Sequence, residues 1–166
     1  MNENEFYRYI EMYRKKVWSA AMCYVKNVSD ADDITQDVFL KLYTYTGEFE
    51  SDDHVKHWLI RCAVNMSINL LRSHWYKKSV PLDEALGKEY YDKTDEGREI
   101  TTEMFMKLSS KNSTALYLYY YEGYSTEEIA SMLGISETAV QNRLMRGRNR
   151  LKELITEERM VMRNDS

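Results

Sequence analysis

Apolar residues recur at steps of three and four along the first half of the chain, which is the spacing of an amphipathic α-helix. Three runs can be separated: Phe6, Ile10, Tyr13, Val17, Ala21 and Tyr24; Ala31, Ile34, Val38 and Leu42; and Val55, Leu59, Cys62, Met66 and Leu70. We predict one helix for each run, the third over 55–78. The chain should break at 27–29, with Ser29 or Asp30 as the next N-cap, and form a loop over 47–53.

The same periodicity resumes near Ile100 and continues almost to the end of the chain. A helix is expected over 112–122, followed by two more that meet at Gly134. The single proline, Pro81, lies in an acidic stretch without regular spacing. We therefore predict an all-α fold in three parts: a helical domain over 1–78, an acidic linker over 79–107 and a second helical domain over 108–160.

The last two predicted helices have helix-turn-helix spacing. Ser125 and Glu128 form a capping-box pattern at the start of the first, and Gly134 suits the left-handed conformation that ends it. Ser136 caps the second, whose buried face is expected to carry Val140, Leu144, Gly147, Leu151 and Leu154. The glycine on that face indicates a close approach to another backbone.

The opposite face of the final helix is rich in amides and arginines. At about 100° per residue it carries Thr138, Gln141, Asn142, Met145, Arg146 and Asn149, flanked by Arg143, Arg148 and Arg150. Amides can read adenine edges in the major groove, and arginines bind guanine or phosphate. A helical hairpin with a solvated arginine face is the alternative. DNA binding is favoured because several features all fit a DNA-binding helix-turn-helix: the helix caps, the glycine at the turn, the small Ala130 and the basic face.

The third predicted helix carries a second polar stripe, beside its buried face: Trp58, Asn65, Asn69, Arg72 and Tyr76, with Arg61, Lys77 and Lys78 adding charge. Aromatic rings, amides and cations together suit single-stranded nucleic acid, which offers exposed bases and a charged backbone. For Trp58 we favour packing in the core. The second helix instead begins with Asp30, Asp32, Asp33 and Asp37, which compensate the helix dipole or meet a basic protein partner.

Charge is distributed unevenly along a chain of 166 residues and net charge −4. Two basic islands, 51–78 (+3) and 140–155 (+4), lie on either side of the acidic stretch 79–107 (−4). No apolar run is long enough to insert into a membrane, and the acidic start is not a secretory signal. Two cysteines, Cys23 and Cys62, favour a cytoplasmic location.

Neither cofactor nor enzyme chemistry has a signature in the sequence. It contains no glycine-rich phosphate loop and no nucleophile motif. His54, His57 and Cys62 are spaced so that one helix cannot direct all three at a single metal ion. We therefore expect no catalytic residues, no metal and no cofactor.

Three segments, in order, resemble the bacterial sigma factors of RNA polymerase. Residues 30–42 look like their polymerase-binding helix, and Trp58-Leu59 with Ala63, Asn65 and Leu71-Arg72 looks like their promoter-melting helix. Residues 127–144 look like their C-terminal helix-turn-helix. The short chain without a middle domain resembles the extracytoplasmic-function group, and the match covers about residues 5–155. The chain departs from that pattern at three places. It has Leu108-Ser109 where the family usually has Leu-Pro, and Asn69 where the family often has Asp. It has Gly147 where the family commonly has Ala.

The resemblance implies that the chain is a sigma factor with core RNA polymerase, promoter DNA and an anti-sigma factor as partners. Core polymerase would bind Asp30, Asp33, Gln36, Asp37, Phe39, Leu40 and Lys41. The unpaired minus-ten element would be captured by the loop over 47–54 together with Arg61, Asn65, Asn69, Arg72, Tyr76, Lys77 and Lys78. The duplex minus-thirty-five element would be read by Ser136, Thr138, Gln141, Asn142, Arg143, Arg146, Arg148 and Arg150. The acidic linker would follow the RNA path through the polymerase.

Two other functions stay open at this point. A stand-alone helix-turn-helix regulator would bind symmetric duplex sites without polymerase. A sigma-like decoy would bind polymerase or an anti-sigma factor and never melt DNA. The two basic islands favour the sigma factor over both.

Overall fold

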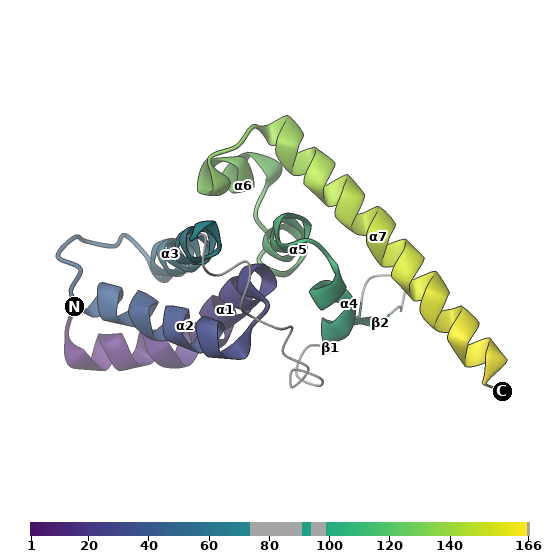
Figure 1. Cartoon of the computed structure of the whole chain (residues 1–166). Helices are drawn as coiled ribbons and strands as arrows, with labels where there is room; N and C mark the ends of the chain where they lie inside the picture. The colour runs from purple at the N-terminus through teal and green to yellow at the C-terminus, as the bar shows by residue number, and fades with distance from the viewer. Residues whose placement is uncertain (74–90, 94–98, 166) are drawn as a thin grey trace. The chain divides into compact units, whose positions relative to one another are not determined.

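A computed structural model describes residues 1–73, 91–93 and 99–165 (Figure 1). The chain divides into two compact units, Met1–Asp83 and Glu84–Ser166. The boundary between them falls inside the stretch predicted as a linker. Apart from one pair of three-residue strands, the described elements of both units are helices, so the all-α prediction is confirmed.

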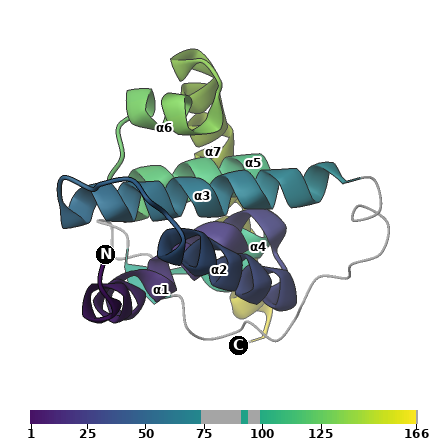
Figure 2. The ribbon, with the colours of Figure 1, turned by 90° about the vertical axis from the view of Figure 1, so that its left-hand side faces the viewer.

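The first unit contains α1 (Glu3–Val25), α2 (Val28–Tyr43) and α3 (Asp52–Arg72), each of which packs against the other two (Figure 2). These helices follow the three apolar runs of the sequence. The side chains sealed most completely between them are Val17, Val38, Leu42, Val55, Leu59, Ile60 and Val64. The third helix begins at Asp52 because Ser51 caps it, three residues earlier than predicted. Its predicted last turns, 74–78, lie outside the described residues.

The break between α1 and α2 is shorter than predicted. Lys26 ends α1 in the left-handed conformation, with φ 56° and ψ 31°. The N-cap of α2 is Asn27, whose side chain accepts a hydrogen bond of 3.0 Å from the backbone N–H of Asp30. The prediction of Ser29 or Asp30 as the cap was wrong. One left-handed residue is enough to turn the chain, so the next helix starts at once.

The second unit begins with two short antiparallel strands, β1 (Tyr91–Lys93) and β2 (Glu99–Thr101), in which Tyr91 pairs with Thr101 and Lys93 with Glu99. They are followed by α4 (Thr102–Lys107), α5 (Ser110–Leu116), a π-helical turn η3 (Tyr117–Tyr121), α6 (Thr126–Leu133) and α7 (Glu137–Asn164). The strands and α4 lie within the predicted linker. Three residues are too few to reveal a strand by alternation.

The helix-turn-helix of α6 and α7 is confirmed, down to its caps. Ser125 and Glu128 form a reciprocal capping box, with bonds of 3.1 and 3.2 Å. Gly134 ends α6 in the left-handed conformation at φ 65°, and Ser136 caps α7 through the N–H of Ala139. The predicted inner face of α7 is buried, including Val140, Leu144 and Gly147.

Gly147 lies where α7 approaches α5 closely. A Cβ at this position would lie 2.6 Å from Cδ1 and 3.1 Å from Cγ of Leu116, which is 1 % exposed. Gly147→Val is therefore expected to destabilise the second unit by about 2–3 kcal/mol through overpacking. Denaturant unfolding measures this, with Asn149→Val on the exposed face of α7 as the control. Equal stability of the two variants would contradict the close approach.

Lys26 gives the first unit a pH dependence, because burial lowers the pKa of its ammonium group from 10.5 to about 8. Between these two values the unfolded chain binds more protons than the folded chain, so the free energy of unfolding rises with pH. Below pH 8 the charged side chain destabilises the fold. We expect Lys26→Gln to be more stable than the wild type by about 1 kcal/mol at pH 7, after allowance for partial exposure.

This advantage should shrink steadily as the pH is raised towards 10. Urea unfolding at half-unit pH steps measures it, with the exposed Lys15→Gln on the same helix as the control. Unfolding free energies of Lys26→Gln and wild type that run parallel over the whole range would show that Lys26 does not titrate in this window.

Candidate functional site

The exposed face of α2 is acidic, as the sequence predicts. Asp33, Gln36 and Asp37 are exposed, as are Leu40, at 62 %, and Lys41; Asp30 is half-buried. The carboxylate of Asp32 accepts a hydrogen bond of 2.9 Å from the indole Nε1 of Trp18 on α1. Phe39 lies in the core at 7 % exposure, so its contribution is to hold α2 in place. The accessible face therefore presents two carboxylates and an amide beside an apolar side chain.

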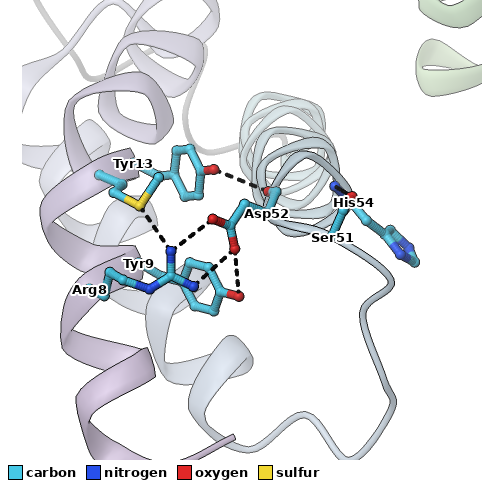
Figure 3. Close-up of polar contacts among 7 residues, drawn as sticks. Arg8, Tyr9, Tyr13, Ser51, Asp52 and His54 are labelled. Carbon is cyan, nitrogen blue, oxygen red and sulfur yellow. Dashed lines mark hydrogen bonds and ion pairs between the residues drawn. The ribbon is translucent and has the colours of Figure 1, made fainter.

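The start of α3 is fixed to α1 by a polar cluster centred on Asp52 (Figure 3). Both guanidinium amino groups of Arg8 bind the Asp52 carboxylate, at 2.8 and 2.9 Å, and the Tyr9 hydroxyl donates to it at 3.1 Å. The Tyr13 hydroxyl donates to the Asp52 carbonyl oxygen at 3.1 Å. The bond from Arg8 lowers the pKa of Asp52, whereas burial and the same carboxylate raise the pKa of Tyr9. The cluster thus fixes the residue at which the loop over 44–51 ends.

The same loop packs its aromatic side chains on Trp58. The ring of Trp58 lies 5.0 Å from that of Tyr45 and 5.7 Å from that of Phe49, centre to centre, and the Lys41 ammonium lies 5.9 Å from it. A Cβ at Gly47 would meet the end of the Tyr45 ring, so the glycine lets this ring lie against the loop backbone. Trp58 is half-buried under this cluster rather than sealed in the core.

The sequence analysis assigned the loop over 47–54 to the minus-ten element, but it singled out neither Phe49 nor the Asp52 cluster, and it missed Tyr45. The signal that could have found Tyr45 and Phe49 is their position within a short loop that also holds Gly47. The partners of Asp52 come from α1, more than 35 residues earlier in the chain, and no local pattern reveals such a pairing.

Beyond the loop, α3 presents its predicted polar stripe to solvent. Arg61, Asn65, Asn69 and Arg72 are all exposed, at steps of four, four and three residues. The opposite side of the helix contains fully buried Leu59, Ala63 and Val64. Tyr76, Lys77 and Lys78 lie outside the described residues. The stripe therefore extends from the aromatic loop along the described length of the helix.

The polar face of α7 is also accessible. Thr138, Gln141, Asn142 and Arg146 are exposed, Arg143 is half-buried, and Ser136 caps the helix with its side chain at the surface. Two of the predicted arginines have partners within the unit. Arg150 binds Glu153 at 3.0 Å and Glu157 at 3.5 Å, and Arg148 donates from Nε to the Tyr120 hydroxyl at 2.6 Å.

Neither a metal centre nor a membrane span is found in the described part of the chain. Over residues 1–73, 91–93 and 99–165, no three His, Cys, Asp or Glu side chains are grouped so that they could hold a metal ion. Among these same residues, no helix has the length and apolarity required to span a bilayer.

The two units match two family models in the order that the sequence predicts. Residues 9–76 match Sigma-70 region 2, and residues 98–151 match Sigma-70, region 4. Together the two models cover well over half of the chain.

Individual relatives agree with these matches. The chain is 31 % identical over 131 residues to the ECF RNA polymerase sigma factor SigM of Mycobacterium tuberculosis, an alignment that covers 76 % of this chain and 64 % of the relative. It is 29 % identical over 151 residues to the ECF RNA polymerase sigma factor SigM of Bacillus subtilis, covering 87 % and 91 %. The chain thus spans slightly less than two-thirds of the first relative and nearly all of the second.

The fold is also similar to that of a solved structure. The sigma factor RpoE from Bartonella quintana, crystallised with the anti-sigma factor NepR, superimposes with a TM-score of 0.71 at 21 % identity, covering 92 % of this chain and 97 % of that one. Matching regions, relatives and fold agree, and the chain belongs to the sigma-70 family, within its extracytoplasmic-function (ECF) RNA polymerase sigma factors.

Proposed function

We propose that this chain binds core RNA polymerase through α2 and directs promoter recognition and opening through α3 and α7. In this account residues 1–78 bind polymerase and the minus-ten element, 79–107 form the linker, and 108–160 bind the minus-thirty-five element. The chain carries out no reaction of its own, since nucleotide addition belongs to the polymerase, and it acts in the cytoplasm, where polymerase and promoter DNA are.

The exposed polar stripe of α3 carries this proposal. Asn65, Asn69 and Arg72 project from a helix whose other face is buried, next to a loop whose aromatic rings pack at tilted and edge-to-face angles. Unpaired bases need stacking surfaces and hydrogen-bond partners, whereas a paired duplex offers no base face to stack on. A stand-alone duplex-binding regulator has no use for this surface. The stripe therefore favours a protein that opens DNA.

The electrostatics of α2 support a protein partner for the first unit. Asp33 and Asp37 are exposed, and no hydrogen bond or ion pair engages their carboxylates within the described residues. A basic surface on a partner protein would be attracted to this face, and the positions of the charges would fix the orientation in which the partner binds. Leu40 adds apolar area beside the charges.

On α7, the exposed amides Gln141 and Asn142 lie within about one and a half turns of Arg143 and Arg146. This combination fits base reading in a major groove. The RpoE of Bartonella quintana was crystallised with an anti-sigma factor. We propose a partner of the same class for this chain.

Selection from a random duplex library, with and without core polymerase of the same organism, tests the proposal. A sigma factor should enrich an asymmetric pair of elements at fixed spacing when polymerase is present. Enrichment of a symmetric site without polymerase would identify a stand-alone regulator. Binding to polymerase without enrichment of any sequence would identify a decoy.

A further inference from the structure

Arg148 and Arg150 lie two residues apart on α7 and have partners of different chemistry. Its Nε donates to the Tyr120 hydroxyl at 2.6 Å, and its guanidinium carbon lies 5.4 Å from the centre of the Tyr120 ring and 5.9 Å from that of Tyr119. The two tyrosine rings meet edge to face, with centres 4.9 Å apart. A bracket of two neutral aromatic side chains therefore fixes the guanidinium.

Both tyrosines of the bracket belong to the π-helical turn η3. Tyr119 and Tyr120 are adjacent in the sequence, both lie in this turn, and both reach Arg148. They remain 36 % and 56 % exposed. π-Helical turns occur often at functional sites, since they carry a cost that a regular helix avoids.

Among the described residues, no carboxylate forms an ion pair with Arg148. Arg150, two residues further on, binds the carboxylates of Glu153 and Glu157, which neutralise it. The partners of Arg148 are uncharged, and they use its Nε, so its two amino groups are the donors that remain for an external anion. A guanidinium fixed in one plane loses little side-chain entropy when it binds a phosphate through such a pair of donors.

The position of Arg148 fits the backbone of a duplex bound by α7. It follows Gln141 by seven residues, which is two turns or about 10 Å along the helix. Thr138, Gln141, Met145 and Arg148 follow one another at steps of three and four, so they share one side of the helix. A cation two turns beyond the base-reading residues is placed to meet a phosphate at the edge of the groove.

We propose that Tyr119 and Tyr120 are positioning residues that hold Arg148 as a phosphate contact for duplex DNA. This inference rests on the proposed role of α7 in reading the minus-thirty-five element. It separates Arg148, which contributes affinity without sequence preference, from Gln141, Asn142 and Arg146, which contribute selectivity.

The test measures affinity of the holoenzyme for the selected duplex between 50 and 300 mM salt, and for the same duplex with its upstream element scrambled. Arg148→Ala should weaken binding of both duplexes about tenfold and reduce the slope of log affinity against log salt by about 1. Tyr120→Phe removes only the hydroxyl. It should weaken both duplexes about threefold and leave the slope close to that of the wild type.

Two further variants separate the possible outcomes. Arg159→Ala, an exposed cation further along α7, should keep the wild-type slope. Arg146→Ala should reduce the preference for the unscrambled duplex. An unchanged slope in Arg148→Ala, with Arg146→Ala still impaired, would overturn this inference alone. No effect from either variant would overturn the role of α7 itself.

Tyr120→Phe distinguishes positioning from a merely structural role. The thermal midpoint of the second unit should stay within about 2 °C of the wild type, because the hydrogen bond that this variant removes is exposed. A lower midpoint with unchanged affinity of the folded protein would overturn the positioning role. A changed ratio between the two duplexes would show that the bracket reads bases instead.

Discussion

Reversing two charges on α2, with Asp33→Lys and Asp37→Lys together, is expected to weaken binding to core RNA polymerase by about 100-fold. Both carboxylates are exposed on the face proposed to meet polymerase. Each reversal replaces an attraction with a repulsion, which typically changes affinity by a factor of about 10 at close range. Because neither residue contributes to the core, the free energy of unfolding should change little.

Titration of the labelled chain with core polymerase measures this effect. The control is Glu3→Lys with Glu11→Lys on α1, which changes net charge by the same amount at two exposed positions. Binding of isolated duplex DNA through α7 should be retained in both double variants. Wild-type affinity of Asp33→Lys/Asp37→Lys for polymerase would show that the acidic face is only a compensation of the helix dipole.

The second large effect is expected on α3. Replacing Asn65 and Arg72 together by Ala should reduce formation of the open promoter complex by at least tenfold and change closed-complex affinity less than threefold. Extruding and unpairing bases costs a few kcal/mol, which hydrogen bonds and stacking on the protein have to return. Removing one hydrogen-bonding side chain from such a site costs about 1–3 kcal/mol.

Permanganate reactivity of unpaired thymines reports the open complex, and gel retardation with holoenzyme reports the closed one. Asn4→Ala with Arg14→Ala, also exposed but on α1, removes the same two functional groups elsewhere and should leave opening intact. Equal losses in closed and open complexes would mean that the stripe acts in initial binding. Unchanged permanganate reactivity would show that Asn65 and Arg72 do not contribute to promoter opening.

The polar cluster at Asp52 and the aromatic loop explain why α3 can act in this way. Arg8 and Tyr9 hold the carboxylate at the start of the helix, and Tyr45 with Phe49 rests on Trp58 one to two turns later. The loop over 44–51 is thus held at its end by the Asp52 cluster and along its length by packing on Trp58, before DNA binds. Pre-organisation of this kind lowers the entropy lost on binding.

Much of this architecture could be predicted from local rules. The apolar periods indicate α1, α2 and α3, and the pairing of Ser125 with Glu128, followed by Gly134, indicates the helix-turn-helix. Such features depend on residues within one or two turns of each other, so the sequence displays them directly.

The remainder depends on interactions between distant segments. Arg148 was predicted to be a DNA-facing cation, but its bond to Tyr120, in the π-helical turn, joins residues 28 positions apart. Phe39 was placed on the polymerase face because it lies in the segment that resembles the polymerase-binding helix of the family, yet it packs in the core. The strands β1 and β2 were missed because three residues are too few to show the alternation of apolar and polar positions that indicates a strand.

The central claim is that this chain makes core polymerase start transcription at promoters it selects. Multi-round transcription by purified core polymerase over a promoter library, with and without the chain, tests it most directly. The account predicts new start sites that depend on the chain, preceded by two shared sequence elements at constant spacing. The absence of any chain-dependent start site, although the chain binds polymerase, would contradict it.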